Sequence, residues 1–93
     1  MTEEAAVVWM RLRASDRADD KNAVVYLRAQ VRGMARPDLV VGEQYPRGRV
    51  RTQAIRRTTN RLVEMGILER GLTPLGRSLI QEIATTDRTG EAP

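Results

Sequence analysis

The stretch RGRVRTQAIRRTTNRLVEMGIL, residues 47 to 68, carries six arginines and, before Glu64, no acidic residue. Most of it has the periodicity of one amphipathic helix, because side chains on a helix turn by about 100 degrees per residue. The side expected to face a core carries Ile55, Thr59, Leu62 and Gly66, flanked by Val63 and Met65. Thr52 is a candidate N-cap, and Gly66 is a natural stop.

The opposite side of this helix is cationic and rich in groups that hydrogen-bond to base edges. A helix that lies in the major groove of DNA needs such side chains. The residues expected there are Gln53, Arg57, Asn60, Arg61 and Glu64, with Arg56 at the edge. Ahead of the helix, Arg47, Arg49 and Arg51 are expected in a basic loop, and Thr52 is placed to donate to a phosphate.

Composition and charge limit the classes of function. The chain of 93 residues has no Cys and no His, which excludes disulfides, the usual zinc sites and the common His- or Cys-based catalytic arrangements. The net charge of +4 is uneven: residues 44 to 63 carry +6, and the rest carries −2. Without a glycine-rich phosphate cradle or paired carboxylates, we expect neither an enzyme nor a cofactor.

No apolar run approaches 18 residues, and the N-terminus lacks the pattern of a secretory signal, so a membrane-free, cytoplasmic location is expected. The pattern predicts one domain over residues 1–86 with an aliphatic core, since aromatic residues are only 3% of the chain. Residues 87–93 have nothing to bury and are expected to form a disordered tail.

Two helices are expected before the basic stretch. The first spans about residues 3–14, and its Trp9 is interpreted as an anchor of the core or of a dimer interface. The second spans about residues 21–35, with Asp19 or Asp20 as its cap. Alternatively, Val24 to Tyr26 form a short strand.

The segment from Asp38 to Arg49 is ambiguous. Leu39 to Val41 fit either a strand or one helical turn, and Tyr45 to Arg49 have the composition of a loop. Pro46 to Arg49 resemble the core of an AT-hook, which inserts arginines into a narrow minor groove, although an ordinary basic loop that contacts phosphates also fits.

After Gly66, two short apolar segments flank Arg70-Gly71 and predict a very tight β-hairpin. Thr73 and Pro74 then have the pattern of an N-cap and a first helical residue, so a last helix is expected over about residues 74–86.

The segment from Thr52 to Ile83 resembles winged helix-turn-helix regulators of the MarR and PadR type. The resemblance lies in Ala54-Ile55, Thr59, Leu62 and GIL at 66–68, followed by LTPLGR at 72–77. It implies a mostly α winged helix-turn-helix with three to five helices and a minimal β-hairpin wing. This chain departs from the pattern in two ways. Its wing is almost absent, because only Arg70-Gly71 stand there. A positioning helix before the recognition helix is also not obvious, and residues 39–44 are the only room for one.

The resemblance and the cationic helix together favour a sequence-specific double-stranded DNA-binding protein, such as a small transcriptional repressor or a phage or plasmid factor. The expected DNA-binding residues are Arg47, Arg49, Arg51, Thr52, Gln53, Arg56, Arg57, Asn60, Arg61 and Arg70. One alternative is a winged-helix adaptor or inhibitor that docks on another protein, because arginine is also enriched in protein interfaces. Another is a solvated face whose arginines pair partly with Glu64 and Glu69.

A homodimer is expected, because one small recognition helix reads only a few base pairs. The candidate interface consists of apolar residues of the first and last helices that exceed what one small core needs: Trp9, Met10, Leu79, Ile80 and Ile83.

Overall fold

The structure is a computed structural model, and it describes residues 3–91, with side chains for residues 4–87. Within this range the chain is mostly α, as predicted, and no strand forms. The five helices are α1 (Glu3–Ala14), α2 (Ala18–Val31), α3 (Pro37–Gly42), α4 (Arg49–Glu64) and α5 (Pro74–Glu91).

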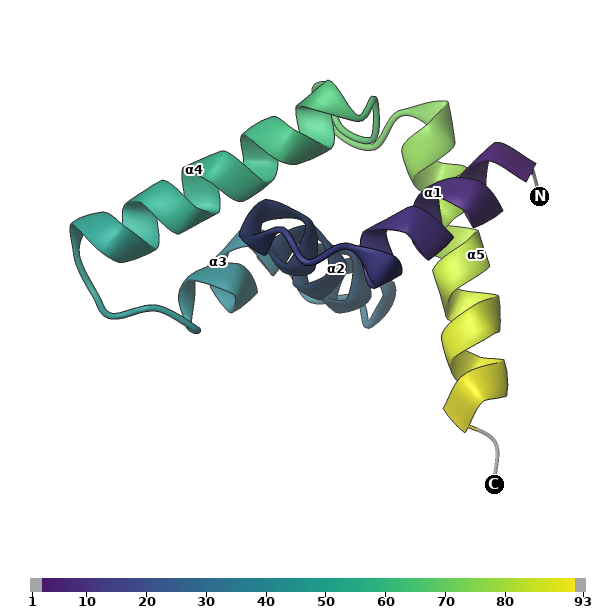
Figure 1. Cartoon of the computed structure of the whole chain (residues 1–93), viewed down its shortest axis with the longest axis horizontal. Helices are drawn as coiled ribbons and strands as arrows, with labels where there is room; N and C mark the ends of the chain where they lie inside the picture. The colour runs from purple at the N-terminus through teal and green to yellow at the C-terminus, as the bar shows by residue number, and fades with distance from the viewer. Residues whose placement is uncertain (1–2, 92–93) are drawn as a thin grey trace.

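Helix α2 is the centre of the fold. It packs against α1, α3, α4 and α5. Among the described helices, α4 lies along α2 and α3, and its Leu62 reaches the core cluster shared with α1 and α5. In Figure 1, α4 therefore runs along one margin of the molecule, above α2 and α3, while α1 and α5 pack together at the other end. This arrangement leaves the side of α4 that points away from α2 without a helical neighbour.

Helix α1 has the predicted bounds, and α2 does not. Helix α2 begins three residues earlier than expected, with Arg17 at the N-cap position, so Asp19 and Asp20 lie in its first turn and do not cap it. It ends at Val31, because Gly33 adopts a φ of 76° and the backbone N–H of Met34 returns to the carbonyl of Ala29. The alternative strand at residues 24–26 is wrong, since these residues are helical.

The ambiguous segment forms α3, so the helical interpretation of residues 39–41 is correct. Pro37 occupies the first turn, where its missing N–H costs nothing. Gly42 is buried, and a Cβ atom there would approach Cδ1 of Ile55 to 2.8 Å. Glycine thus permits α3 to lie close against α4.

Helix α4 begins three residues earlier than predicted, so Arg49 and Arg51 are helical rather than part of a loop. The start is set by Gly48, whose φ of 109° is accessible to glycine but not to other residues. Thr52 is not the cap; its hydroxyl donates back to the carbonyl of Gly48 at 3.2 Å. The helix ends at Glu64, and Gly66, the predicted stop, lies two residues further on with a φ of 77°.

The buried side of α4 is turned by roughly 70 degrees from the predicted one, less than the step of about 100 degrees between adjacent residues. Leu62 is fully buried as expected, but its partners are Ala54 and Thr58 rather than Ile55 and Thr59, which are half-buried. Val63 is 49% exposed. The solvent side is correspondingly turned toward Arg49, Arg56 and Asn60.

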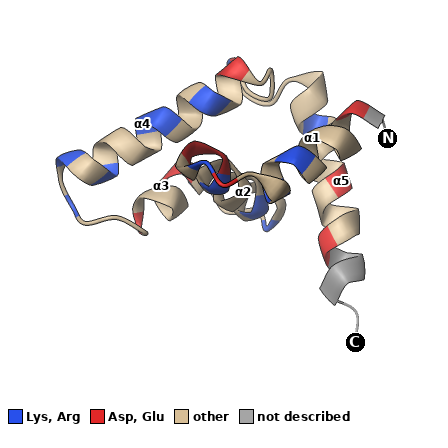
Figure 2. Ribbon diagram, viewed as in Figure 1, with Lys and Arg blue, Asp and Glu red and all other residues tan. Residues whose placement is uncertain are grey.

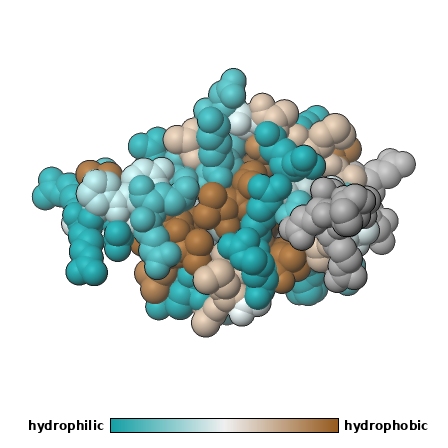
Figure 3. Space-filling model, turned by 90° about the horizontal axis from the view of Figure 1, so that it is seen from below, coloured by the Kyte–Doolittle hydropathy of each residue, from teal (hydrophilic) through white to brown (hydrophobic). Residues whose placement is uncertain are grey.

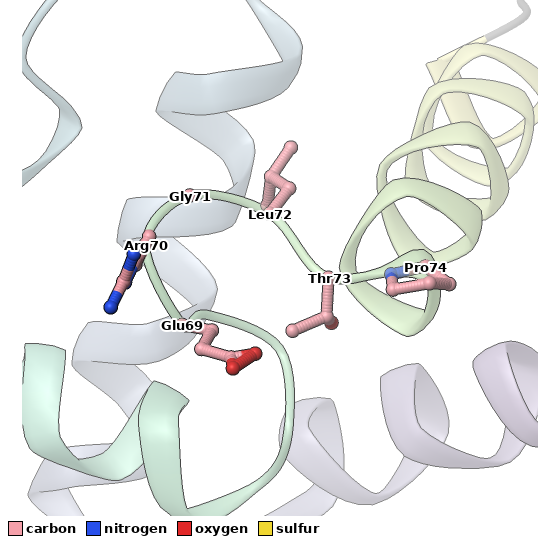
Figure 4. A pocket seen from close by; sticks show the side chains of 6 residues that line it. All are labelled: Glu69, Arg70, Gly71, Leu72, Thr73 and Pro74. Atoms are coloured by element: carbon pink, nitrogen blue, oxygen red, sulfur yellow. The ribbon is translucent and has the colours of Figure 1, made fainter.

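The predicted hairpin is reduced to a single antiparallel bridge between Leu68 and Leu72. The turn between them is tight, and the backbone N–H of Glu69 donates to the carbonyl of Gly71 at 2.8 Å. Figure 4 shows Arg70 at this turn pointing away from Thr73 and Pro74. No wing forms between residues 66 and 74 beyond this bridge.

Helix α5 begins as predicted, because the hydroxyl of Thr73 accepts the N–H of Gly76 at 3.0 Å and Pro74 follows as the first helical residue. It runs five residues further than expected, to Glu91. Asp87, assigned to the tail, pairs with Arg28 of α2 at 3.0 Å. The remaining tail residues, 92 and 93, lie outside the described part.

Most of the residues expected at a dimer interface are instead buried in the core of the single chain. Trp9, Leu79 and Ile83 are at most 2% exposed inside the single chain, so they are not surplus apolar residues. Ile80 packs partly against the same core, and only Met10 is well exposed, at 64%. The cluster contains Trp9, Leu12, Ala23, Leu27, Leu62, Ile67, Leu79 and Ile83. Seen from below, some hydrophobic surface remains visible between hydrophilic side chains (Figure 3).

Candidate nucleic-acid interface

The solvent side of α4 carries a stripe of four exposed polar side chains. Arg49, Gln53, Arg56 and Asn60 follow one another at spacings of four, three and four residues, so they lie on one face of the helix. Arg49, Gln53 and Arg56, with Thr52, line a shallow open groove. Below, the four residues of the stripe are called the α4 face.

The α4 face is positively charged, and the negative charge near it comes from other elements. Figure 2 shows basic residues recurring along α4, with acidic residues at the nearby start of α2 and at the end of α4. No acidic residue lies within α4 before Glu64. The guanidinium and amide groups of this face can donate hydrogen bonds to phosphates and to the edges of bases.

Arg61 does not belong to this exposed face. Its Nε lies 2.7 Å from Oδ1 of Asp20, and the side chains of Arg61 and Asp20 are only 24% and 7% exposed. Asp20 also accepts a hydrogen bond from the hydroxyl of Ser15 at 2.7 Å, and Glu64 lies 3.4 Å from Arg61. The predicted DNA-binding residue is therefore engaged in holding α4 against α2.

The charge of Asp20 is stabilised by its neighbours. Burial alone would raise the pKa of this carboxyl, but the hydrogen bonds from Arg61 and Ser15 and the positive charge of Arg61 outweigh it and hold the pKa below its ordinary value. The same contacts raise the pKa of Arg61, chiefly through the hydrogen bond to Asp20. At neutral pH both partners are charged, and the pair is a fixed link between α2 and α4.

Arg51 is also held by the protein. It lies inside α4, half-buried, and its Nε and Nη2 donate to the carbonyl oxygen of Tyr45 at 3.1 and 2.8 Å. The hydroxyl of Tyr45 in turn accepts the side-chain amide of the buried Asn22 at 2.7 Å. Arg51 thus supports the turn that leads from α3 into α4.

Arg57 occupies an intermediate position at the edge of the α4 face. Its Nε lies 3.4 Å from Oδ1 of Asp19, yet 69% of its side chain is exposed. Arg47, in the turn before α4, and Arg70, in the turn before α5, are exposed as well. Of the ten expected residues, the structure gathers Arg49, Thr52, Gln53, Arg56, Arg57 and Asn60 on one side of α4.

Sequence reasoning missed the roles of Asp19 and Asp20. Both were expected only as helix caps, because an acidic residue before a helical pattern usually signals its start. The pairing with Arg57 and Arg61 joins residues about forty positions apart in the chain. The only sequence signal for this pairing is the presence of two adjacent acidic residues in a chain that has one cationic segment.

Within residues 4–87 no group of three or more acidic side chains could hold a metal ion. Likewise, none of the described helices is long and apolar enough to cross a membrane. Searches of family models, curated proteins and solved structures found no match to this chain.

Proposed function

We propose that this chain is a sequence-specific double-stranded DNA-binding protein of the winged helix-turn-helix type, acting as a small regulator or as a phage or plasmid DNA-binding factor. The observation that carries the proposal is the exposed α4 face, which combines Arg49 and Arg56 with the amides of Gln53 and Asn60. None of the helices that the structure describes packs over it. Arginine pairs bidentately with guanine, and asparagine or glutamine with adenine.

The order of elements supports this type of fold. Helix α3 takes the place of the positioning helix, because it precedes α4 and packs against it through Gly42. The bridge between Leu68 and Leu72 stands where a wing would be, and its short turn offers Arg70 alone to a neighbouring phosphate or minor groove. We therefore assign base contacts to α4 and only a minor contribution to the wing.

The experiment begins with selection of bound fragments from random DNA at two salt concentrations. Asn60→Ala should weaken binding to the selected duplex by about 1–3 kcal/mol and leave binding to random duplex nearly unchanged, because it removes a base contact. Arg47→Ala is the matched control; it should weaken both duplexes alike and lower the salt slope by roughly one.

Equal losses on selected and random DNA for both variants would show that α4 is not the reading element. Failure of the unmodified protein to bind any duplex at low salt would overturn the proposal. Such a result would favour the alternative, a winged-helix adaptor or inhibitor that docks on a protein, since that function needs no affinity for plain duplex.

We also propose that the protein acts as a homodimer, with the outer side of α1 as the interface. Val7 and Met10 are 39% and 64% exposed there, between Glu4 and Arg11. Antiparallel pairing of two α1 helices would bring Glu4 of each copy near Arg11 of the other.

Light scattering at micromolar concentration should give twice the mass of the chain. Arg11→Glu should produce monomers, because it places like charges opposite each other, and the double exchange Glu4→Arg with Arg11→Glu should restore the dimer. A wild-type monomer, or a dimer unaffected by Arg11→Glu, would contradict this interface.

A further inference from the structure

Arg57 is the one arginine near the α4 face that combines wide exposure with an acidic partner from another helix. Its guanidinium meets Asp19 of α2 at 3.4 Å, and no other acidic side chain within residues 4–87 pairs with it. The arginine atom nearest to Asp19 is Nε, the guanidinium nitrogen that is attached to the aliphatic part of the side chain. The two terminal nitrogens, which form the fork that recognises guanine or phosphate, are at the far end.

Asp19 is held in a fixed place relative to α4. Its neighbour Asp20 is anchored by Arg61 and by Ser15, both at 2.7 Å. Asp19 and Asp20 are consecutive residues in the first turn of α2, so the contacts of Asp20 hold the backbone from which the Asp19 side chain projects. The Asp19 side chain is only 21% exposed, and its Oδ1 lies 3.4 Å from Nε of Arg57.

The pair of Asp19 and Arg57 lies between two shallow depressions. Both residues line each of them; the first depression also includes Gln53, and the second includes Asn60. Gln53 precedes Arg57 by four residues and Asn60 follows it by three, so the three side chains are neighbours on the helix. The direction in which the Arg57 guanidinium points therefore decides whether it lies beside the side-chain amides of Gln53 and Asn60 or away from them.

We propose that Asp19 is a positioning residue that sets DNA specificity through Arg57; this inference rests on the proposed DNA-binding function. Its carboxylate holds Nε and thereby presents the terminal fork of Arg57 beside Gln53 and Asn60, where a base edge would lie. Its negative charge also opposes the approach of a phosphate to the same arginine. Both effects favour a contact of Arg57 with a base over a contact with the DNA backbone. Because Arg57 is already positioned, its side chain loses less conformational entropy on binding.

The test compares Asp19→Asn with the unmodified protein on a selected duplex and on a random duplex. The amide keeps the shape of the side chain but removes the charge. Binding to random duplex should tighten and its salt dependence should steepen by about one unit, because Arg57 becomes free to contact a phosphate. The ratio of selected to random affinity should fall by at least about fivefold, the lower end of what one bidentate base contact provides.

Asp87→Asn is the matched control. It removes the same charge from a similar exposed Arg–Asp pair, with the carboxylate 25% exposed, but at the Arg28 contact between α2 and α5. It should leave the specificity ratio unchanged. If Asp87→Asn lowers the ratio as much as Asp19→Asn, the effect is one of net charge and the inference is overturned.

A double-mutant cycle with Arg57→Gln separates positioning from a structural effect. In the Arg57→Gln background, Asp19→Asn should no longer change the ratio, and an undiminished change there would overturn the inference. A wild-type protein that prefers its selected duplex but is unaffected by Asp19→Asn would overturn this inference alone. A wild-type protein without affinity for any duplex would overturn the proposed function and this inference together.

Discussion

Replacing Arg61 by alanine should destabilise the protein by about 3 kcal/mol, because it leaves the carboxylate of Asp20 buried without its partner. Asp20 is 7% exposed, and its Oδ1 lies 2.7 Å from Nε of Arg61, so little water can take over the lost contact. Urea denaturation of the purified variant should show a lower midpoint with an unchanged slope.

Arg56→Ala is the control for this prediction. Arg56 lies on the same helix but is exposed, and its loss should change stability by less than about 0.5 kcal/mol. The double variant Asp20→Leu with Arg61→Met should recover most of the stability, since an apolar pair needs no compensating charge. Equal midpoints for Arg61→Ala and Arg56→Ala would contradict the structural role of the pair.

The contribution of the pair should also depend on pH in a defined direction. The pKa of Asp20 is lower in the folded protein than its ordinary value of 3.8, so the stabilisation is complete above that value. It is lost as the pH falls through the lower folded pKa. The difference in unfolding free energy between wild type and Arg61→Ala should therefore narrow when denaturation is measured below about pH 4.

The parts of the fold that were predictable from the sequence depend on local patterns. Gly66 ends α4, and Thr73 with Pro74 begins α5, because each of these signals acts within a few residues of the chain. Leu62 was correctly expected in the core. Local patterns also predicted α1, α2, α4 and α5 at about their observed places, but they left α3 open as a strand or one helical turn.

The start and the rotation of α4 were missed for two different reasons, the glycine just before the helix for the start and contacts with other segments for the rotation. Gly48 moves the helix start ahead of Thr52, and the links from Arg61 to Asp20 and from Arg51 to the Tyr45 carbonyl turn these two arginines inward. Hydrophobic periodicity treats every arginine as solvent-facing and therefore assigned Arg61 to the DNA-binding side of the helix, whereas Arg51 was expected in the basic loop before it. The same limitation made Trp9 an ambiguous anchor until its neighbours in α2 and α5 were placed.

The length of α5 illustrates a second kind of limitation. The pattern of buried residues ends at Ile83, and nothing apolar follows to predict further helix. The structure continues to Glu91, and Asp87 on this extension pairs with Arg28, which also lies over the ring of Trp9 at 5.4 Å from its centroid. An ion pair between residues 59 positions apart leaves no periodic signal in the sequence.

Replacing Leu62 by alanine should destabilise the fold by about 2–5 kcal/mol, the usual range for truncation of a fully buried leucine. Leu62 is 0% exposed and lies in the cluster that joins α4 to Trp9, Leu27 and Leu79. The neighbouring Val63 is 49% exposed, so Val63→Ala should cost less than about 0.5 kcal/mol. Thermal and urea denaturation of the two variants test the rotation of α4 directly, because adjacent residues on a helix point about 100 degrees apart. Similar losses for both variants would mean that α4 is turned differently, and the assignment of Arg49, Arg56 and Asn60 to one exposed face would then be wrong as well.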